Sequence, residues 1–598
     1  MHSEQTSARP AGRSSRDLTG QASCADGDHG RRNAGGHCCR GPAQQSRWPG
    51  PTPAASRLLP ALRLPALAVL TLIWVSIWGA TAAMAAVPIP VDPPTADHSE
   101  FDQLQGDFAN GREVTRACLT CHTEAGEQVR SSIHWRWEYE HPYTGQLLGK
   151  QHVVNSFCNN VTTNLARCTA CHVGYGWDGP DFDFSDDSRV DCLVCHDTTG
   201  TYEKAPKRAG RVLQEPTRVH GHKLTPPDLG EVARNVGPTS KATCGGCHFF
   251  GGGGNGSKHG DLDTSLLDPK PGLDVHMSPD GAGLTCGDCH VEAAHHIAGS
   301  RYQVNARDRK GTGRPGERRH AASCESCHGT DPHPYGDNPA AMYQARKLNG
   351  HSDRVACQSC HIPAFARGGV ATKTWWDWSK AGRLSADGNR IKRHDEDGNL
   401  TYGTRFGAIR WGEDLTPTYR WFDGTMRFTL PDQTVDASEP VPINHFRGGP
   451  EDPDARIWPF KMMRGKQPYD PVNQRLVYMQ LFGKTEEAYW TGLDWQPAIA
   501  SAMAQAGLPF SGEVAFAETR MAWPITHMVA PAEDALACGD CHAEDGRMAE
   551  LTGLYLPGRD AAPGVERWGR LALAAAVLGV AVHLVLRLWL NRRRRQDT

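Results

Sequence analysis

Cysteines and histidines that recur in one pattern carry the strongest chemical signal in this 598-residue chain. The sequence Cys-x-x-Cys-His occurs eight times. Its two thiols can form thioethers with the two vinyl groups of one haem, and the His that follows can ligate the iron. One copy arises by chance but eight do not, so the chain is predicted to hold eight covalently bound c-type haems. The predicted attachment and iron-ligand residues are Cys118, Cys121 and His122; Cys168, Cys171 and His172; Cys192, Cys195 and His196; Cys244, Cys247 and His248; Cys286, Cys289 and His290; Cys324, Cys327 and His328; Cys357, Cys360 and His361; and Cys538, Cys541 and His542.

The spacing of these motifs indicates the kind of fold that holds them. The first seven begin 50, 24, 52, 42, 38 and 33 residues apart, and segments that short rarely form an apolar core without a covalent or metal staple. We therefore expect a mainly α, loop-rich multihaem cytochrome c fold in which the haems supply much of the core. The formal net charge is −3, and the sequence shows no basic patch that would indicate nucleic-acid binding.

Second axial ligands must come from histidines outside the motifs, because a haem that only transfers electrons usually has two strong ligands. Sixteen such histidines remain in the predicted mature domain. The count therefore permits a fully six-coordinate electron wire. Local context favours His134, His259, His276, His295, His333, His351 and His527, with His296 and His320 as close competitors.

Cys158 is the cysteine left over in the predicted mature chain. Cys24, Cys38 and Cys39 precede a predicted export signal, so Cys158 has no partner for an intramolecular disulfide. Two interpretations stay open: a small buried hydrophobic residue or a functional thiol in an exported redox protein.

A glycine-rich stretch after the fourth motif, residues 251–256, leads into two adjacent nitrogen donors, Lys258 and His259. Glycine lets a backbone approach a flat ring closely and adopt positive φ. A desolvated Lys amine has a lowered pKa and can ligate iron. A phosphate loop is a poor interpretation, because the Walker spacing is absent.

Both ends of the chain carry apolar segments with targeting features. Residues 1–56 have the composition of a disordered leader or a mis-assigned start, and residues 57–86 match a secretory signal peptide, with an uncleaved anchor as the alternative. Residues 568–590 predict one transmembrane helix, and the basic tail 591–598 orients it with the haem domain outside the cytoplasm. We expect the periplasmic side of a bacterial inner membrane.

The remaining chain divides into a haem-array region (87–363) and an aromatic-rich covering region with the eighth motif (364–560). The tryptophans of the second region are expected to pack its core and cover haem edges. Residues 401–430 have hairpin character, and 486–507 have a helical pattern.

Several passages outside the haem motifs resemble the octahaem tetrathionate reductase family of periplasmic c-type cytochromes. The resemblance covers roughly residues 110–558. Its specific passages are Asn155–Cys158, Arg167–His172, Val190–Gly200, Lys258–Asp261, Arg464–Asp470 and Thr526–Pro531.

The resemblance implies a catalytic second haem whose iron is ligated by a lysine from outside its own motif. That lysine corresponds to Lys258, and the family's pocket Asn and Cys correspond to Asn155 and Cys158. An Asp is usual three residues before the lysine, whereas this chain has Asn255. The change removes a possible proton relay and a negative charge. It is therefore expected to alter the substrate preference, and it weakens the expectation that tetrathionate is the substrate.

These features together predict a membrane-tethered reductase fed by a quinol-oxidising cytochrome. Its expected substrates are tetrathionate, nitrite or hydroxylamine, and Lys258, Cys158, Asn155 and Asn255 are the candidate catalytic residues. The rival prediction is a non-catalytic electron-transfer protein. A hydroxylamine-oxidoreductase-like enzyme ranks third, because no local pattern identifies the tyrosine that those enzymes crosslink to haem.

Overall fold

The computed structural model describes residues 96–219, 222–304, 322–560 and 562–596, all within one compact unit, Met84–Thr598. The predicted leader, the predicted signal peptide and His320 lie outside the described residues.

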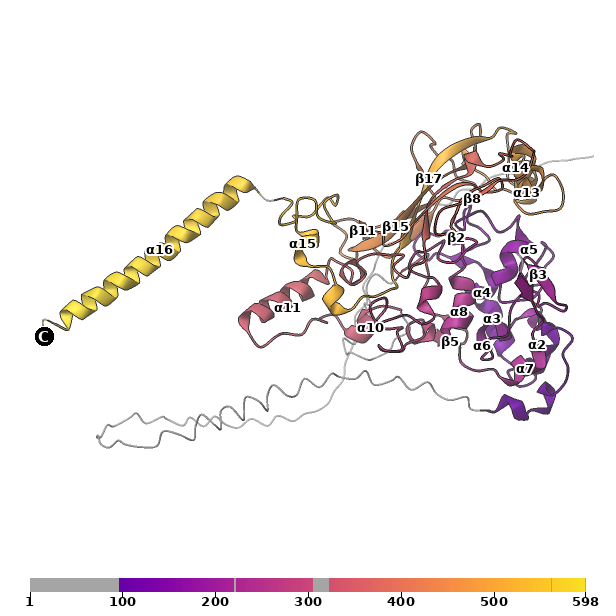
Figure 1. The fold of residues 1–598 in the computed structure, drawn as a ribbon, viewed down its shortest axis with the longest axis horizontal. Helices are drawn as coiled ribbons and strands as arrows, with labels where there is room; N and C mark the ends of the chain where they lie inside the picture. The colour runs from indigo at the N-terminus through magenta and orange to yellow at the C-terminus, as the bar shows by residue number, and fades with distance from the viewer. Residues whose placement is uncertain (1–95, 220–221, 305–321, 561, 597–598) are drawn as a thin grey trace, which may run out of the picture. The chain divides into compact units, whose positions relative to one another are not determined.

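Short helices dominate the region of the first seven motifs, and each motif lies on or beside one (Figure 1). The α-helices are α2 (Gly111–Leu119), α3 (Ala125–Ser131), α4 (Ile133–Arg136), α5 (Leu165–Cys168), α6 (Leu193–His196), α7 (Leu229–Arg234), α8 (Lys241–His248), α9 (Cys286–Cys289), α10 (Glu325–His328), α11 (Pro339–His351), α12 (Gln358–His361), α13 (Tyr489–Gly492), α14 (Trp495–Gln505), α15 (Cys538–Cys541) and α16 (Pro563–Arg594). The 3-10 turns are η1 (His98–Glu100), η2 (Asp102–Leu104), η3 (Thr169–Cys171), η4 (Asp187–Arg189), η5 (Thr264–Leu266), η6 (Trp378–Lys380) and η7 (Ala532–Asp534).

A nine-stranded sheet organises the region that follows. Its path is β13-β17-β15-β7-β10-β9-β8, with β11 and β16 paired to β15. The strands are β1 (Tyr139–Glu140), β2 (Leu147–Leu148), β3 (Thr217–Val219), β4 (His222–Leu224), β5 (Glu292–Ala293), β6 (His296–Ile297), β7 (Thr372–Asp377), β8 (Lys392–His394), β9 (Leu400–Gly403), β10 (Gly407–Gly412), β11 (Thr418–Phe422), β12 (Met426–Phe428), β13 (Val441–Pro442), β14 (Asn444–Phe446), β15 (Arg456–Asp470), β16 (Arg475–Leu476) and β17 (Ala515–Pro524).

This sheet corrects the prediction of a mainly α fold. β15 pairs with β17 in an antiparallel register from Phe460↔Pro524 to Tyr469↔Ala515. Aromatic rings and apolar chains from both strands fill the largest core cluster, in which Trp458, Phe460 and Trp523 are buried. The tryptophans therefore pack a β-sheet core. The expected helix of 486–507 is present as α13 and α14.

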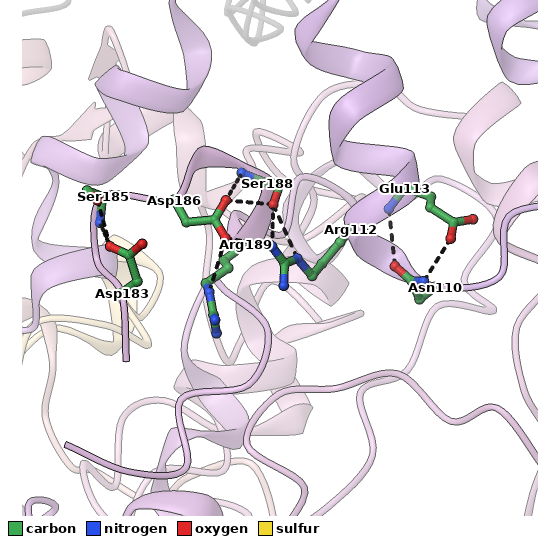
Figure 2. Close-up of polar contacts among 8 residues, drawn as sticks. All are labelled: Asn110, Arg112, Glu113, Asp183, Ser185, Asp186, Ser188 and Arg189. Carbon is green, nitrogen blue, oxygen red and sulfur yellow. Dashed lines mark hydrogen bonds and ion pairs between the residues drawn. The ribbon is translucent and has the colours of Figure 1, made fainter. Parts of the chain in front are cut away.

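A polar network fixes α2, which carries Cys118, against the turn that precedes the third motif (Figure 2). Asn110 caps the helix by accepting from the Glu113 amide at 3.2 Å. Arg112 then donates to Asp186 at 2.6 Å and to Ser188 at 2.8 Å. These contacts bring the first and third motifs together although the chain places the second between them.

Helix α16 is long and apolar enough to cross a membrane by length and composition, with a mean hydropathy of 2.2 in its most apolar window. No residue of α16 is buried in the protein. Four arginines, residues 592–595, follow its apolar segment.

Candidate multihaem redox site

The motifs share a local backbone design, and the second motif departs from it. In six motifs the His amide donates to the carbonyl of the first Cys, as His122 does to Cys118 at 2.9 Å, so both cysteines lie on one face of a single turn. In the second motif the His172 amide donates instead to Thr169 at 2.9 Å. His172 has extended backbone angles, φ −72° and ψ 141°. Its side chain therefore leaves the turn in another direction.

Seven motif histidines each face a second histidine in the described part of the chain. The ring-centroid separations fall between 5.9 and 6.5 Å. The pairs are His122 with His98, His196 with His295, His248 with His134, His290 with His527, His328 with His276, His361 with His333 and His542 with His351.

This spacing fits bis-His haem ligation. Two imidazoles on opposite faces of one metal, each with a metal–nitrogen bond of about 2 Å, have ring centroids about 6 Å apart. Six of the histidines predicted as second ligands occupy such positions. His98 is a further one, which the sequence analysis did not single out. It is the sole His between residues 87 and 121, which was the available signal.

The cysteines of different motifs lie close together in a branched order. Thiols within hydrogen-bonding reach join the first motif to the third, the second to the fourth, the fourth to the fifth, and the sixth to the seventh. Longer-range electrostatic interactions between thiols join the third to the fourth, the fifth to the sixth, and the seventh to the eighth. The motifs thus form one continuous series in which the second is a branch beside the fourth.

His172 lies in an aromatic cage instead of facing another histidine. The ring is fully buried, 4.9 Å from both Trp135 and Trp177 by centroid. Its Nε2 donates to the Trp135 carbonyl at 2.7 Å. Because Nε2 donates, it offers no lone pair to a metal in this arrangement, whereas His196, His290 and His542 contact carbonyls through Nδ1.

Lys258 is a buried amine beside the second motif. Its Nζ lies 5.0 Å from the Trp523 ring centroid and interacts electrostatically with Cys171. Burial, then the positive charges of Arg301 and Lys150, lowers the pKa of Lys258 well below its usual value. Gly251 permits this placement, because a Cβ there would lie 3.0 Å from Lys258 Cδ.

A buried lysine from the sheet holds the backbone at Lys258. Lys461 on β15 has no exposed side-chain surface. Its Nζ donates to the carbonyls of Lys258 and Ser257 at 2.8 and 3.2 Å and to Thr372 Oγ1 at 2.5 Å. Lys461 comes from a strand about 200 residues away and belongs to no haem motif, so sequence reasoning gave no signal for it.

Asn155 and Cys158 belong to one tight turn. Asn155 donates to Gln467 at 2.8 Å and accepts from the Phe157 amide at 2.7 Å. Phe157 has a φ of 103°, a strained value for a residue with a side chain. Burial raises the pKa of the Cys158 thiol, and the neighbouring charges of Lys373 and Arg167 oppose that rise.

Asn255 and His259, two further candidates, make contacts outside the histidine pairs. Asn255 uses its side chain within its own loop, donating to Thr264 Oγ1 at 2.7 Å and accepting from the Thr264 amide at 3.0 Å. His259 packs edge-on against Trp523 at 4.9 Å, and no motif histidine among the described residues faces it. Asn255 therefore braces the glycine-rich loop, and His259 does not complete a histidine pair.

Comparison with known proteins decides the family. The crystal structure of the octahaem cytochrome c from Shewanella oneidensis matches with a TM-score of 0.64 and 38% sequence identity, over 76% of this chain and 95% of that one. The chain belongs to the octahaem cytochromes c. It therefore carries covalently bound c-type haem.

Two further comparisons give a family-model match and one similar protein for this octahaem cytochrome. A family model described as bacterial cytochrome c matches residues 373–545. An uncharacterised protein of Archaeoglobus fulgidus is 24% identical over 257 residues, which is 36% of this chain and 84% of that protein. The family-model match spans β7 to the eighth motif, so the sheet belongs to the cytochrome itself.

Proposed function

We propose that this octahaem cytochrome is a reductase that passes electrons along seven bis-His haems to the haem of the second motif, whose iron is ligated by Lys258. The observation that carries the proposal is the contrast between seven histidine pairs and the second motif. There His172 donates its Nε2 hydrogen to a backbone carbonyl, while the Lys258 amine is buried and interacts electrostatically with Cys171. A haem ligated differently from its neighbours is suited to substrate reduction, because bis-His ligation is typical of haems that only transfer electrons.

The proposed substrates are tetrathionate, nitrite and hydroxylamine. Tetrathionate takes two electrons to break its central S–S bond and gives two thiosulfates. Nitrite takes six electrons and eight protons to give ammonium and two waters, and hydroxylamine takes two electrons and three protons to give ammonium and water. The haem would supply the electrons, and a neighbouring series of haem sites suits multi-electron reduction.

The protein's own groups position the substrate and supply protons. Cys158 stays a protonated thiol at neutral pH because burial raises its pKa, so it can donate to a bound oxygen or nitrogen. Asn155 fixes the turn that carries Cys158 through its bonds to Gln467 and Phe157. Asn255, bonded to Thr264, contributes to loop shape instead of to proton transfer.

The proposed location is the periplasmic face of the inner membrane. It rests on residues 57–86 as an export signal and on α16 as an anchor whose arginine-rich end lies in the cytoplasm. The proposed donor is a quinol-oxidising cytochrome of the same membrane. The motif series ends at the eighth motif, 21 residues before Pro563 at the start of α16.

The test is anaerobic oxidation of reduced viologen by the purified holoprotein, with each substrate offered separately. Turnover with any of the three is expected, and the ranking of kcat/KM identifies the working substrate. Lys258→Met should abolish turnover at unchanged haem content, whereas the exposed-site variant Lys392→Met should not. A wild-type protein with full haem content and no turnover would instead be a non-catalytic electron carrier.

A further inference from the structure

Two buried hydrogen-bond donors beside Lys258 lack an acceptor. Arg301 Nη1 and Trp523 Nε1 are both inaccessible to solvent and have no hydrogen-bond partner in the described part of the chain. The other terminal nitrogen of Arg301 is engaged, since it donates to the Tyr302 hydroxyl at 2.6 Å. A buried donor without an acceptor is strongly unfavourable, so native structures nearly always supply one.

Arg301 and Lys258 both lie near the Trp523 ring, which carries the second donor. The Arg301 guanidinium carbon is 5.3 Å and Lys258 Nζ is 5.0 Å from the Trp523 ring centroid. Arg301 also interacts electrostatically with Lys258 and His259. No carboxylate among the described residues forms an ion pair with Arg301. The nearby Asp261 is instead bonded to His527 and to the Thr526 amide.

The chemistry of this arrangement selects an anion. Guanidinium and indole N–H groups only donate, so their missing partner must accept hydrogen bonds. A guanidinium in a desolvated site binds an oxyanion strongly and with defined geometry. Two sources could provide the oxygen atoms: the bound substrate or a haem propionate.

We propose that Arg301 and Trp523 form the oxyanion-binding pair for the substrate at this site. Arg301 binds one oxygen of nitrite, or of a terminal sulfonate of tetrathionate, and the Trp523 indole N–H binds a second. The inference rests on the proposed reductase function and assigns its substrate class: small oxyanions are bound more tightly than uncharged substrates of similar size.

The experiment compares an anion with a neutral substrate in the full-length holoprotein. At mildly alkaline pH nitrite is an anion and hydroxylamine is uncharged. Nitrite binding to the oxidised protein is titrated by optical difference spectroscopy, and KM is measured for both substrates in the viologen assay. The variants are Arg301→Met, Arg301→Lys and Trp523→Phe, with Arg427→Met at an exposed position of β12 as the matched control.

Arg301→Met should raise the nitrite Kd and KM by about 10- to 100-fold, the loss expected for a charged hydrogen bond. Its KM for hydroxylamine should change less than about threefold. Arg301→Lys should recover part of the nitrite affinity, Trp523→Phe should weaken it by several-fold, and Arg427→Met should leave it unchanged.

Each contrary result has a distinct meaning. An equal loss for both substrates, with a shifted spectrum of the substrate-free protein, would assign the pair to a haem propionate and overturn the proposal. An unchanged nitrite Kd in Arg301→Met would also overturn it. If the wild-type protein turned over none of the three substrates while its nitrite Kd still depended on Arg301, the reductase function would fail and the anion site would stand.

Discussion

Lys461 donates from the centre of the sheet to the backbone carbonyl of Lys258, with Nζ and O 2.8 Å apart. The long strand β15 thereby fixes the segment that bears the proposed iron ligand. Lys461 contacts the backbone of that segment and Thr372, so its role is to position Lys258.

Replacing Lys461 should disturb one haem among eight. Lys461→Met removes the donor to the buried Lys258 carbonyl, which should lower the free energy of unfolding by about 1–3 kcal/mol. The Ser257 carbonyl keeps the Lys373 amide as a donor at 3.4 Å. The spectrum and reduction potential of the haem that Lys258 is proposed to ligate should change while the bis-His signals stay constant. Electron paramagnetic resonance with a potentiometric titration checks this. Lys466→Met on the same strand is the control, and unchanged signals in both variants would remove the positioning role.

The unusual position of His172 predicts unequal effects of two similar substitutions. His248→Ala should convert the haem of the fourth motif from low spin to high spin, because it removes one member of the His134–His248 pair. His172→Ala should leave the spin states unchanged, because its Nε2 is bonded to the Trp135 carbonyl. Magnetic circular dichroism distinguishes the two variants. A new high-spin signal in His172→Ala would restore that residue as an iron ligand.

Two adjacent glycines of the glycine-rich loop separate the effect of a steric clash from the effect of backbone strain. Gly252 and Gly253 have φ values of 80° and 88°. A Cβ on Gly252 would lie 2.4 Å from Phe157, whereas one on Gly253 meets nothing within 4 Å. Gly253→Ala should therefore cost about 1–2 kcal/mol from backbone strain, and Gly252→Ala about 1–3 kcal/mol more from overpacking. Urea unfolding followed by tryptophan fluorescence measures both, and equal costs would show that the Phe157 ring moves freely.

The buried amine of Lys373 is expected to make the free energy of unfolding depend on pH. Burial lowers its pKa from 10.5 to about 8, so between these values the unfolded chain binds more protons and stability rises with pH. Below pH 8 the buried charge costs about 3 kcal/mol. Lys373→Met should therefore be most stabilising, relative to wild type, below pH 8 and should lose that advantage by about pH 10.5.

Urea midpoints of wild type and Lys373→Met between pH 7 and 10.5 test this expectation. Lys392→Met, at an exposed site on β8, should run parallel to wild type throughout. Parallel curves for Lys373→Met as well would mean that the Lys373 amine titrates at its ordinary pKa.

The haem motifs were predictable because attachment chemistry is local: two thiols and an imidazole must lie within one turn. Six of the seven histidines expected as second ligands do face a motif histidine. His134 and His351 each lie near one motif in sequence but face the histidine of a different motif. The sheet was not predicted, because β15 contains Pro459 and Pro468, which argue against a central strand. Lys461 and Arg301 could not be found, because only the tertiary fold brings them to Lys258.

The pairing of His290 with His527 spans 237 residues, from 290 to 527. A growing chain emerges N-terminus first, so the fifth motif is synthesised long before the histidine that faces it. If this pair ligates one haem iron, as proposed, that iron would lack its second protein ligand until residue 527 is available. A chain truncated before His527 would therefore leave a site in the middle of the series incomplete, in addition to losing the end of the series.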